Sequence, residues 1–251
     1  MINLINHSVS TKDSTISCSK FAKAEENLRQ LSSRLKKADR PVFIELIGTP
    51  KSGKTTLKNA LVECFSKFDI DVIARRETAE YNPVPKNSDN YNIWMVLELF
   101  KNISEDLSKN TGQVILYDRG ILDRIPWMKF DVSRNNMNQA DFDRIFNLYQ
   151  MQNFSLYKPV TQVFETSPEL SIQRKGAPGF FVNTDTINAY NGFLRQTLPD
   201  IQNHSASYNY VITDTYQGKI KDFILDSAIS ITRGVSRVLD QRTAPESPDN
   251  R

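Results

Sequence analysis

From Pro41 onward, short apolar runs alternate with longer amphipathic segments. The runs are rich in β-branched and aromatic residues, which is typical of strands buried in a parallel sheet. The amphipathic segments repeat apolar residues every three to four positions, as helices do. This alternation predicts an α/β fold in which five parallel strands form a sheet with helices on both faces. We expect strands near 42–47, 71–75, 113–117, 160–165 and 208–213, and helices near 54–66, 91–108, 120–129, 138–156, 168–175, 184–198 and 217–232.

Two of these helices have recognisable start signals. Asn138 stands three residues before Asp141, so its side chain can cap the first turn of the helix that follows. Ser167 precedes Pro168, and proline is favoured at the first position of a helix. We therefore expect helices to begin directly after Asn138 and after Ser167.

The region before the alternating pattern contains one further helix. Residues 1–17 are polar, and we expect them to be mobile. Segment 19–37 then predicts an amphipathic helix that either docks on the main domain or pairs with a partner, including a second copy in a homodimer. Its apolar stripe consists of Phe21, Ala24, Leu28, Leu31 and Leu35.

The C-terminal end carries charge and proline without periodicity, in "DQRTAPESPDNR". Such a composition is typical of a disordered segment. The expected organisation is therefore an N-terminal tail and helix over 1–40, one catalytic domain over 41–232 and a disordered tail over 233–251.

Composition excludes several classes of protein. Of the 251 residues, 39% are hydrophobic and 24% are charged, an ordinary globular balance. No apolar run approaches the roughly 20 residues that cross a bilayer, and the N-terminus lacks the pattern of a secretory signal. Cys18 and Cys64 form no metal motif and suit a reduced, cytoplasmic setting. A net charge of +3 gives no reason to expect nucleic acid as a partner.

The segment "GTPKSGKTTL", residues 48–57, has the spacing of a phosphate-binding loop, or P-loop. It follows an apolar strand and opens an amphipathic helix, which is the context such a loop requires. Lys54 is expected to reach the outer phosphates and Thr55 to bind Mg²⁺. We therefore predict a P-loop NTPase fold with the P-loop strand at the centre of the sheet. The expected nucleotide-binding residues are Gly48, Thr49, Pro50, Lys51, Ser52, Gly53, Lys54, Thr55 and Thr56.

Asp118 ends the third apolar run, where P-loop proteins place a carboxylate that holds Mg²⁺ directly or through water. The next residue is Arg119, whereas many hydrolytic ATPases carry a glutamate there that activates water. The signatures "LSGGQ" and "NKxD" of two other hydrolytic classes are also absent. The segment therefore favours transfer to an organic acceptor over hydrolysis.

Arg76 and Glu77 follow the second strand, beside the expected P-loop edge of the sheet. A glutamate in this position can accept a proton from a substrate hydroxyl. The alternative is an exposed Arg–Glu pair with no catalytic role.

Taken in order, these motifs resemble the thymidylate kinase and deoxynucleoside kinase branch of P-loop kinases. "FIELIGTPKSGKTTL" is similar to their first strand and loop, "ARRETAEYNP" to an Arg-Glu-Pro segment, and "LYDRGILD" to their Asp-Arg and Glu/Asp-Arg-Ser motifs. "SPELSIQRK" is similar to the entry into their lid. The resemblance covers about residues 41–232 and depends on the order and spacing of short motifs.

The resemblance implies roles for individual residues. Glu77 matches the base near the substrate hydroxyl, Asp118 the acidic metal residue, and Arg119 the arginine that bridges the acceptor oxygen and the phosphoryl group. Arg174 and Lys175 match cations of a lid, which we expect near 174–182 because "GAPGFFV" resembles a hinge. The chain departs from the family at Thr78, in place of proline, and at Gly120, in place of serine or an aromatic residue.

The sequence indicates the residues of the acceptor site less clearly than those of the P-loop. Tyr91 and Trp94 lie where the resembled kinases flank the acceptor's base, and they either stack on it or pack in the core. Trp127 is open to the same two interpretations. Arg76 and Arg124 could bind the phosphate of a nucleotide acceptor. Tyr149, Gln150 and Gln152 could instead contact a nucleoside.

We therefore predict phosphoryl transfer from ATP, with Mg²⁺, to a nucleoside or nucleotide. Lys54, Glu77, Asp118, Arg119 and Arg174 are the expected catalytic residues. Two alternatives remain open, because fold does not determine function. One is a regulatory ATPase or nucleotide-binding switch, and the other is a kinase of a different small hydroxyl compound.

Overall fold

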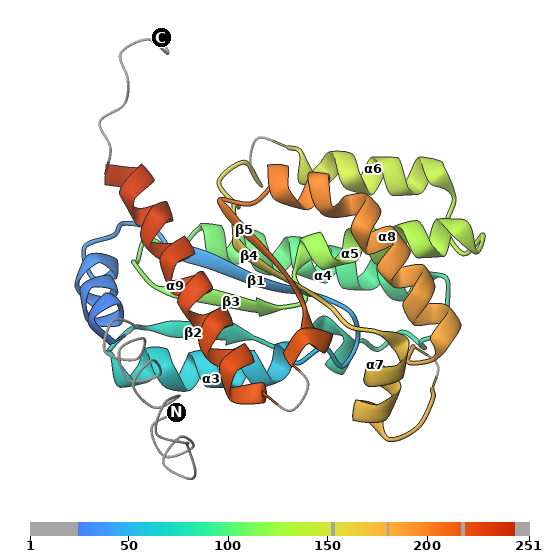
Figure 1. Cartoon of the computed structure of the whole chain (residues 1–251). Coiled ribbons are helices and arrows are strands. Elements are labelled where there is room, and N and C mark those ends of the chain that lie inside the picture. Colours follow the sequence, from blue (N-terminus) through green and yellow to red (C-terminus); the bar gives the residue numbers. More distant parts are fainter. Residues whose placement is uncertain (1–24, 152–153, 180, 217–218, 244–251) are drawn as a thin grey trace.

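The computed structural model describes residues 25–151, 154–179, 181–216 and 219–243. Its sheet has the strand order β2-β3-β1-β4-β5, and every pairing is parallel (Figure 1). The predicted α/β fold is confirmed, with the P-loop strand β1 at the centre. The strands are β1 (Val42–Gly48), β2 (Val72–Arg75), β3 (Val114–Asp118), β4 (Val160–Glu165) and β5 (Ser207–Ile212).

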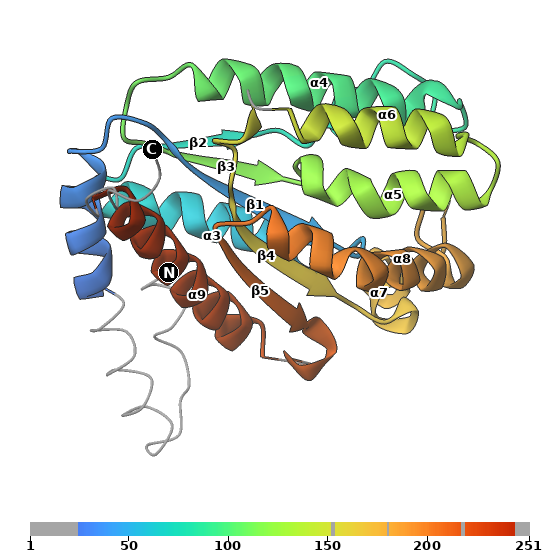
Figure 2. The same ribbon diagram turned by 90° about the horizontal axis from the view of Figure 1, so that it is seen from above.

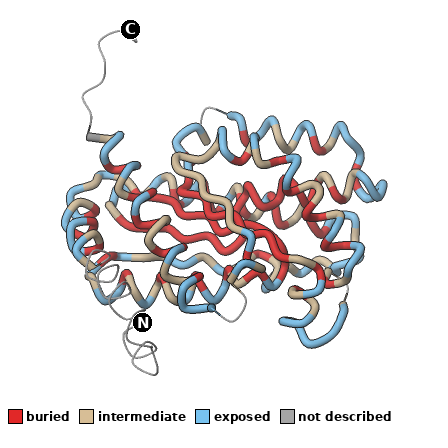
Figure 3. Tube along the Cα trace, in the orientation of Figure 1, coloured by how far each residue is buried: buried red, intermediate tan, exposed pale blue. Residues whose placement is uncertain are grey.

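The register of the central strands determines where the site forms. Leu46 of β1 pairs with Asp118 of β3, and Gly48 pairs with Phe164 of β4. The carboxyl ends of all five strands therefore meet at one edge of the sheet. All residues of β1, β3 and β4 are buried, so this edge is held on a rigid base (Figure 3).

Helices cover both faces of the sheet and enclose separate apolar clusters (Figures 1 and 2). One face carries α4, α5, α6 and α8, and the other carries α3, α9 and the helix over residues 25–35. The helices are α3 (Lys54–Lys67), α4 (Asn90–Leu107), α5 (Ile121–Ser133), α6 (Gln139–Tyr149), α7 (Pro168–Lys175), α8 (Thr184–Asn203) and α9 (Ile220–Thr243), with short 3₁₀ turns η1 (Thr78–Glu80) and η3 (Thr213–Tyr216).

Both predicted helix starts are confirmed. The Asn138 side chain accepts a hydrogen bond of 2.8 Å from the Asp141 N–H, and the Ser167 hydroxyl accepts one of 3.3 Å from the Leu170 N–H. Helix α6 ends at Tyr149, earlier than predicted, because the chain then turns and brings Tyr157 into the core.

The predicted disordered tail over 233–251 is wrong for residues 233–243, which belong to α9. Val235, Val238 and Leu239 are buried there, so the apolar stripe of the helix continues beyond the predicted end. Arg242 also donates hydrogen bonds to the carbonyl oxygens of Arg40 and Pro41, 3.0 and 2.9 Å away, which ties the last turn to the start of β1. Residues 244–251 lie outside the described part of the chain.

The N-terminal helix is docked on the domain over its described residues, 25–35. Leu28, Leu31 and Leu35 are each at most 5% exposed and pack in the cluster beneath α3 and α9. Phe21, Ala24 and the expected mobile segment 1–17 lie outside the described residues, and a homodimer through 19–37 stays a prediction. Within the described ranges, no helix combines the length and apolar character that crossing a membrane requires.

The docked helix should contribute strongly to stability. Leu31 is 1% exposed, so Leu31→Ala should lower the free energy of unfolding by roughly 2–5 kcal/mol, the usual cost of a cavity in a core. Urea denaturation followed by circular dichroism measures this, with Leu97→Ala as control because Leu97 is 55% exposed. Unchanged stability combined with weaker self-association would assign the stripe to a partner instead.

Candidate active site

The P-loop connects β1 to α3 and rests directly on β4. A Cβ atom at Gly48 would lie 1.9 Å from the carbonyl oxygen of Phe164, and its φ of +129° also favours glycine. Gly53, with φ of +101°, precedes the first turn of α3. The amide groups at the start of that helix therefore face the cavity that the loop lines, which is a favourable site for an anion.

Lys54 is buried inside the loop. Its ammonium group donates hydrogen bonds to the carbonyl oxygens of Gly48 and Thr49, at 2.9 and 2.6 Å, and to the hydroxyl of Ser52, at 3.1 Å. Burial lowers the pKa of Lys54 to about 7. An anionic ligand would favour the charged form of this lysine.

Not all of the predicted loop residues face the cavity. Residues 50–56 line a cavity of about 780 Å³, whereas Gly48 and Thr49 do not. The Thr49 hydroxyl instead donates to Asn191 of α8, 2.7 Å away, and accepts from the N–H of Thr166, 3.1 Å away. Thr49 therefore anchors the loop to α8 and to the end of β4.

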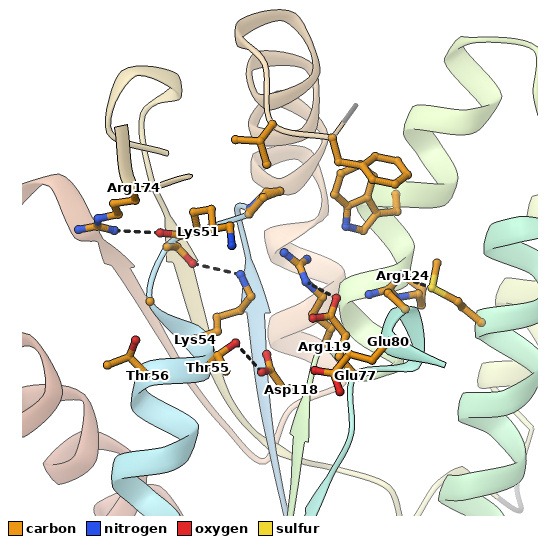
Figure 4. Close-up of a pocket in the computed structure, with 18 of the residues that line it drawn as sticks. Lys51, Lys54, Thr55, Thr56, Glu77, Glu80, Asp118, Arg119, Arg124 and Arg174 are labelled. Atoms are coloured by element: carbon orange, nitrogen blue, oxygen red, sulfur yellow. Dashed lines mark hydrogen bonds and ion pairs between the residues drawn. The ribbon is translucent and has the colours of Figure 1, made fainter. Parts of the chain in front are cut away.

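Thr55 and Asp118 meet at the edge of the sheet, as predicted for a metal site. The Thr55 hydroxyl donates to Asp118 Oδ2 across 2.9 Å (Figure 4). The Lys58 ammonium lies 3.2 Å from the same oxygen. The other carboxylate oxygen, Oδ1, is buried and has no hydrogen-bond partner. Hydroxyl and carboxylate oxygens are the ligands that Mg²⁺ prefers, so the donor set fits this ion.

Arg119 lies at the centre of the site in an unusual backbone conformation. Its φ of +65° is in the left-handed region, which costs about 1–3 kcal/mol for a residue other than glycine. The guanidinium is buried and pairs with Glu77, 3.0 Å away, and with Asp123, 2.8 Å away. Burial opposes the charge, but these carboxylates outweigh it and raise the pKa of Arg119 above its usual value. Glycine would adopt this backbone conformation without strain. We therefore infer that position 119 carries arginine for its guanidinium group, not for its backbone.

Asp123 holds the site together, although the sequence did not single it out. Its Oδ1 accepts hydrogen bonds from the Gly48 N–H and the Tyr190 hydroxyl, at 2.8 and 3.0 Å. Its Oδ2 accepts from Arg119 and Arg124, at 2.8 and 2.9 Å. Burial opposes ionisation of Asp123, yet the neighbouring cations hold its pKa below the usual range.

A second buried carboxylate, Glu45, fixes the start of α5. Its Oε1 accepts from the N–H groups of Leu122 and Asp123, at 2.7 and 3.1 Å, and its Oε2 accepts from the Tyr157 hydroxyl at 2.8 Å. Burial raises the pKa of Glu45 to about 7. A Cβ atom at Gly120 would lie 2.4 Å from the carboxyl carbon of Glu45. This close approach explains why position 120 is glycine.

The far half of the cavity is lined by aromatic and polar side chains of α4 and α5. Tyr91, Arg124 and Trp127 line it, together with Glu77 and Arg119. Trp127 packs against Tyr190, with ring centroids 4.5 Å apart and an interplanar angle of 36°. The predicted acceptor residues Tyr91 and Arg124 are therefore brought to the P-loop cavity, and Trp127, which the sequence left open, joins them.

The structure does not bring Arg76 and Trp94 to this cavity. The side chain of Arg76 is 69% exposed and pairs with Glu80 at 3.4 Å. Trp94 packs edge-on against Tyr81, with ring centroids 5.8 Å apart. On α4 the cavity is lined by Tyr91, Asn92 and Met95, so Trp94 projects beside this face rather than into it.

The predicted lid begins at the end of α7, and this helix is fastened to the P-loop. Ser171 donates to the carbonyl oxygen of Pro50 at 2.7 Å, and Arg174 donates to that of Lys51 at 3.1 Å. Arg174 lines the cavity, whereas Lys175 is exposed and is not among the lining residues. Closure of segment 174–182 stays a prediction, and residue 180 lies outside the described part.

A second cavity of about 640 Å³ adjoins the first on the other side of the P-loop. The two share Ser52, Arg174 and Ile220. Helix α7, the η3 turn and the start of α9 provide its walls, including Tyr216 and Phe223. No sequence motif points to this second cavity, because its lining comes from four separate segments of the chain.

No protein-family model and no curated protein matches this chain. Solved structures similar to it include deoxyadenosine kinase from M. mycoides with bound dATP, at 17% identity over 81% of this chain and 100% of that one, with a TM-score of 0.46. The same enzyme with bound dCTP matches at 20% identity over 74% of this chain and 100% of that one, with a TM-score of 0.48. The fold assignment itself comes from the strand order and the P-loop described above.

The burial of Glu45 predicts a pH-dependent stability. Its folded pKa of about 7 exceeds its ordinary value of 4.5, so neutral Glu45 stabilises the fold at low pH and this contribution is lost as the pH rises through 7. Glutamine stays neutral and keeps an oxygen for the Leu122 and Asp123 N–H groups. Glu45→Gln should therefore gain stability relative to wild type between pH 5 and pH 8, by on the order of 2 kcal/mol. Urea denaturation at both pH values measures this, and an equal difference at the two would contradict it.

Proposed function

We propose that this chain is a kinase that transfers the terminal phosphoryl group of ATP to a hydroxyl group of a nucleoside. The observation that carries the proposal is the shared cavity, in which P-loop residues 50–56 and the aromatic residues Tyr91 and Trp127 line one space. Arg119 and Glu77 lie between the P-loop and Arg124 (Figure 4). Donor and acceptor held in one cavity can react in line, which is the main requirement of phosphoryl transfer.

The donor would occupy the P-loop half of the site. Its phosphates would contact the loop amides and Lys54, with Arg174 at the open side. Its base would enter the adjoining cavity, where Tyr216 and Phe223 present aromatic surface. Thr55 and Asp118 would hold Mg²⁺, which neutralises charge on the phosphates when it is bound.

The acceptor would react at the Arg119–Glu77 pair. Its hydroxyl oxygen forms a bond to the terminal phosphorus, the bond from that phosphorus to the bridging oxygen breaks, and ADP leaves. Glu77 accepts the hydroxyl proton. Arg119, fixed by Asp123, stabilises the negative charge on the group in transfer, and its orientation costs nothing at the moment of reaction.

The charges of the acceptor half favour a nucleoside over a nucleotide. Arg119 and Arg124 are both paired with Asp123, and Arg119 is also paired with Glu77. Arg76, the other cation proposed for an acceptor phosphate, is turned outward. A phosphate on the acceptor would therefore meet compensated arginines and two nearby carboxylates, so an uncharged acceptor fits better.

The decisive experiment measures ADP formation from ATP and Mg²⁺, first alone and then with a panel of nucleosides, nucleoside monophosphates and sugars. We expect nucleoside-dependent ADP formation that Lys54→Ala abolishes, because this lysine serves the nucleotide. Consumption without any acceptor would favour the ATPase or switch. Activity with monophosphates alone, or with sugars alone, would identify a different kinase.

Glu77→Gln should reduce acceptor phosphorylation by roughly 10²–10⁴-fold, the usual effect of losing a general base. Glutamine keeps the shape of the side chain, so ATP affinity should stay near that of wild type. Glu98→Gln is the matched control, because Glu98 pairs with Lys101 on α4 and does not line the cavity. Steady-state rates and isothermal titration with ATP measure both effects. A rate that survives Glu77→Gln would leave Asp118, or no base, as the better account.

A further inference from the structure

The acceptor half of the cavity ends at a wall of three aromatic side chains. Phe181 stacks on Tyr91 with ring centroids 6.0 Å apart and an interplanar angle of 26°. It also meets the edge of Trp127, with centroids 5.6 Å apart and an angle of 76°. Phe181 thus lies between a residue of α4 and a residue of α5, and it closes the space between the two helices.

A further cavity of about 620 Å³ lies on the other side of this wall. It shares four lining residues with the acceptor cavity, namely Lys86, Tyr91, Asn92 and Phe181. Residues that line two cavities at once form the boundary between them. The lining of this outer chamber is mixed, with the aromatic ring of Phe130 beside polar residues such as Asp131 and Asn183.

The three members of the wall are not equally fixed. Tyr91 and Trp127 belong to helices and are 5% and 6% exposed, so they are also parts of the core. Phe181 lies between α7 and α8, in a segment held by a pair of hydrogen bonds between Gly179 and Val182, of 2.8 and 3.1 Å. The Asn183 side chain adds a third, of 3.1 Å, to the Gly179 carbonyl oxygen. Phe181 can therefore be replaced by a smaller residue without changing a residue of either helix.

We propose that Phe181 sets the largest acceptor that this kinase admits. The inference rests on the proposed function, because it concerns the base of the nucleoside in that cavity. With the hydroxyl at Glu77 and Arg119, the base extends toward Tyr91, Trp127 and Phe181. A substituent on the edge of the base meets the Phe181 ring, and removal of that ring joins the acceptor cavity to the outer chamber.

The test compares two ligands and three proteins. The ligands are the nucleoside that wild type binds best and its derivative with a benzyl group on the exocyclic amine of the base. The proteins are wild type, Phe181→Ala and the control Phe146→Ala. Phe146 stacks on Phe142 within the α6 region and lines neither cavity. Isothermal titration gives the ratio of the two affinities for each protein and does not require turnover.

Wild type should bind the benzyl derivative more weakly than the parent nucleoside. Phe181→Ala should reduce that discrimination by about tenfold, since the added ring can enter the space of the deleted one and bury its apolar surface. Phe146→Ala should leave the ratio as in wild type. Equal discrimination in wild type and Phe181→Ala, or no discrimination in wild type, would overturn the proposal.

Failure of the proposed function gives a different result, because wild type then binds neither nucleoside. A measurement without ligand separates the two cases. The chain has two tryptophans, so Trp94→Phe leaves Trp127 as the only one. In that background, Phe181→Ala should make Trp127 fluorescence more sensitive to quenching by acrylamide, because removal of the Phe181 ring exposes the indole to solvent. Unchanged quenching would show that Phe181 does not close the wall.

Discussion

The site depends on charge compensation around one buried carboxylate, Asp123. Two arginines, a backbone amide of the P-loop and a tyrosine hydroxyl all converge on it. A lone arginine in this interior would be strongly unfavourable, and so would a lone aspartate. Together they form a network that fixes the guanidinium of Arg119 relative to the phosphate-binding loop. The relative positions of the loop, Arg119 and the cavity that both line therefore follow from electrostatics inside the domain.

The surrounding fold offsets the free-energy cost of burying this charged network. The central strands are buried on both faces and supply apolar contacts that offset the cost of interior charge. Glu45 orients the first turn of α5 and so presents the Asp123 side chain toward β1. Thr49 and Asn191 join the loop to α8, which packs on the same face of the sheet as α5. Each of these polar contacts links segments far apart in the chain, which makes the site a property of the whole domain.

The fold could be predicted from the sequence because each strand and helix is indicated by residues that are close together in the chain. Buried strands show as apolar runs, and the caps at Asn138 and Ser167 are signalled within three residues. The P-loop, Asp118, Arg119 and Glu77 could be found because each follows a strand end that the topology brings to the same edge. The role of Asp123 could not be predicted, since its contact with Gly48 joins residues 75 positions apart. In the sequence, Asp123 looks like any other polar position on a helix. The sequence predicts Arg76 and Trp94 in the cavity because their neighbours in the chain line it. In the structure both side chains pack against Tyr81 instead, and this contact sets their direction.

The contact between Glu45 and Gly120 has a consequence for how such sequences diverge. The carboxylate occupies the space that any larger residue at position 120 would require. A larger residue at position 120 would therefore clash with Glu45, and a small apolar residue at position 45 would leave an empty, polar hole at the start of α5. The pair should substitute together across related chains, with glutamate in the first strand accompanied by glycine directly after the Asp-Arg pair.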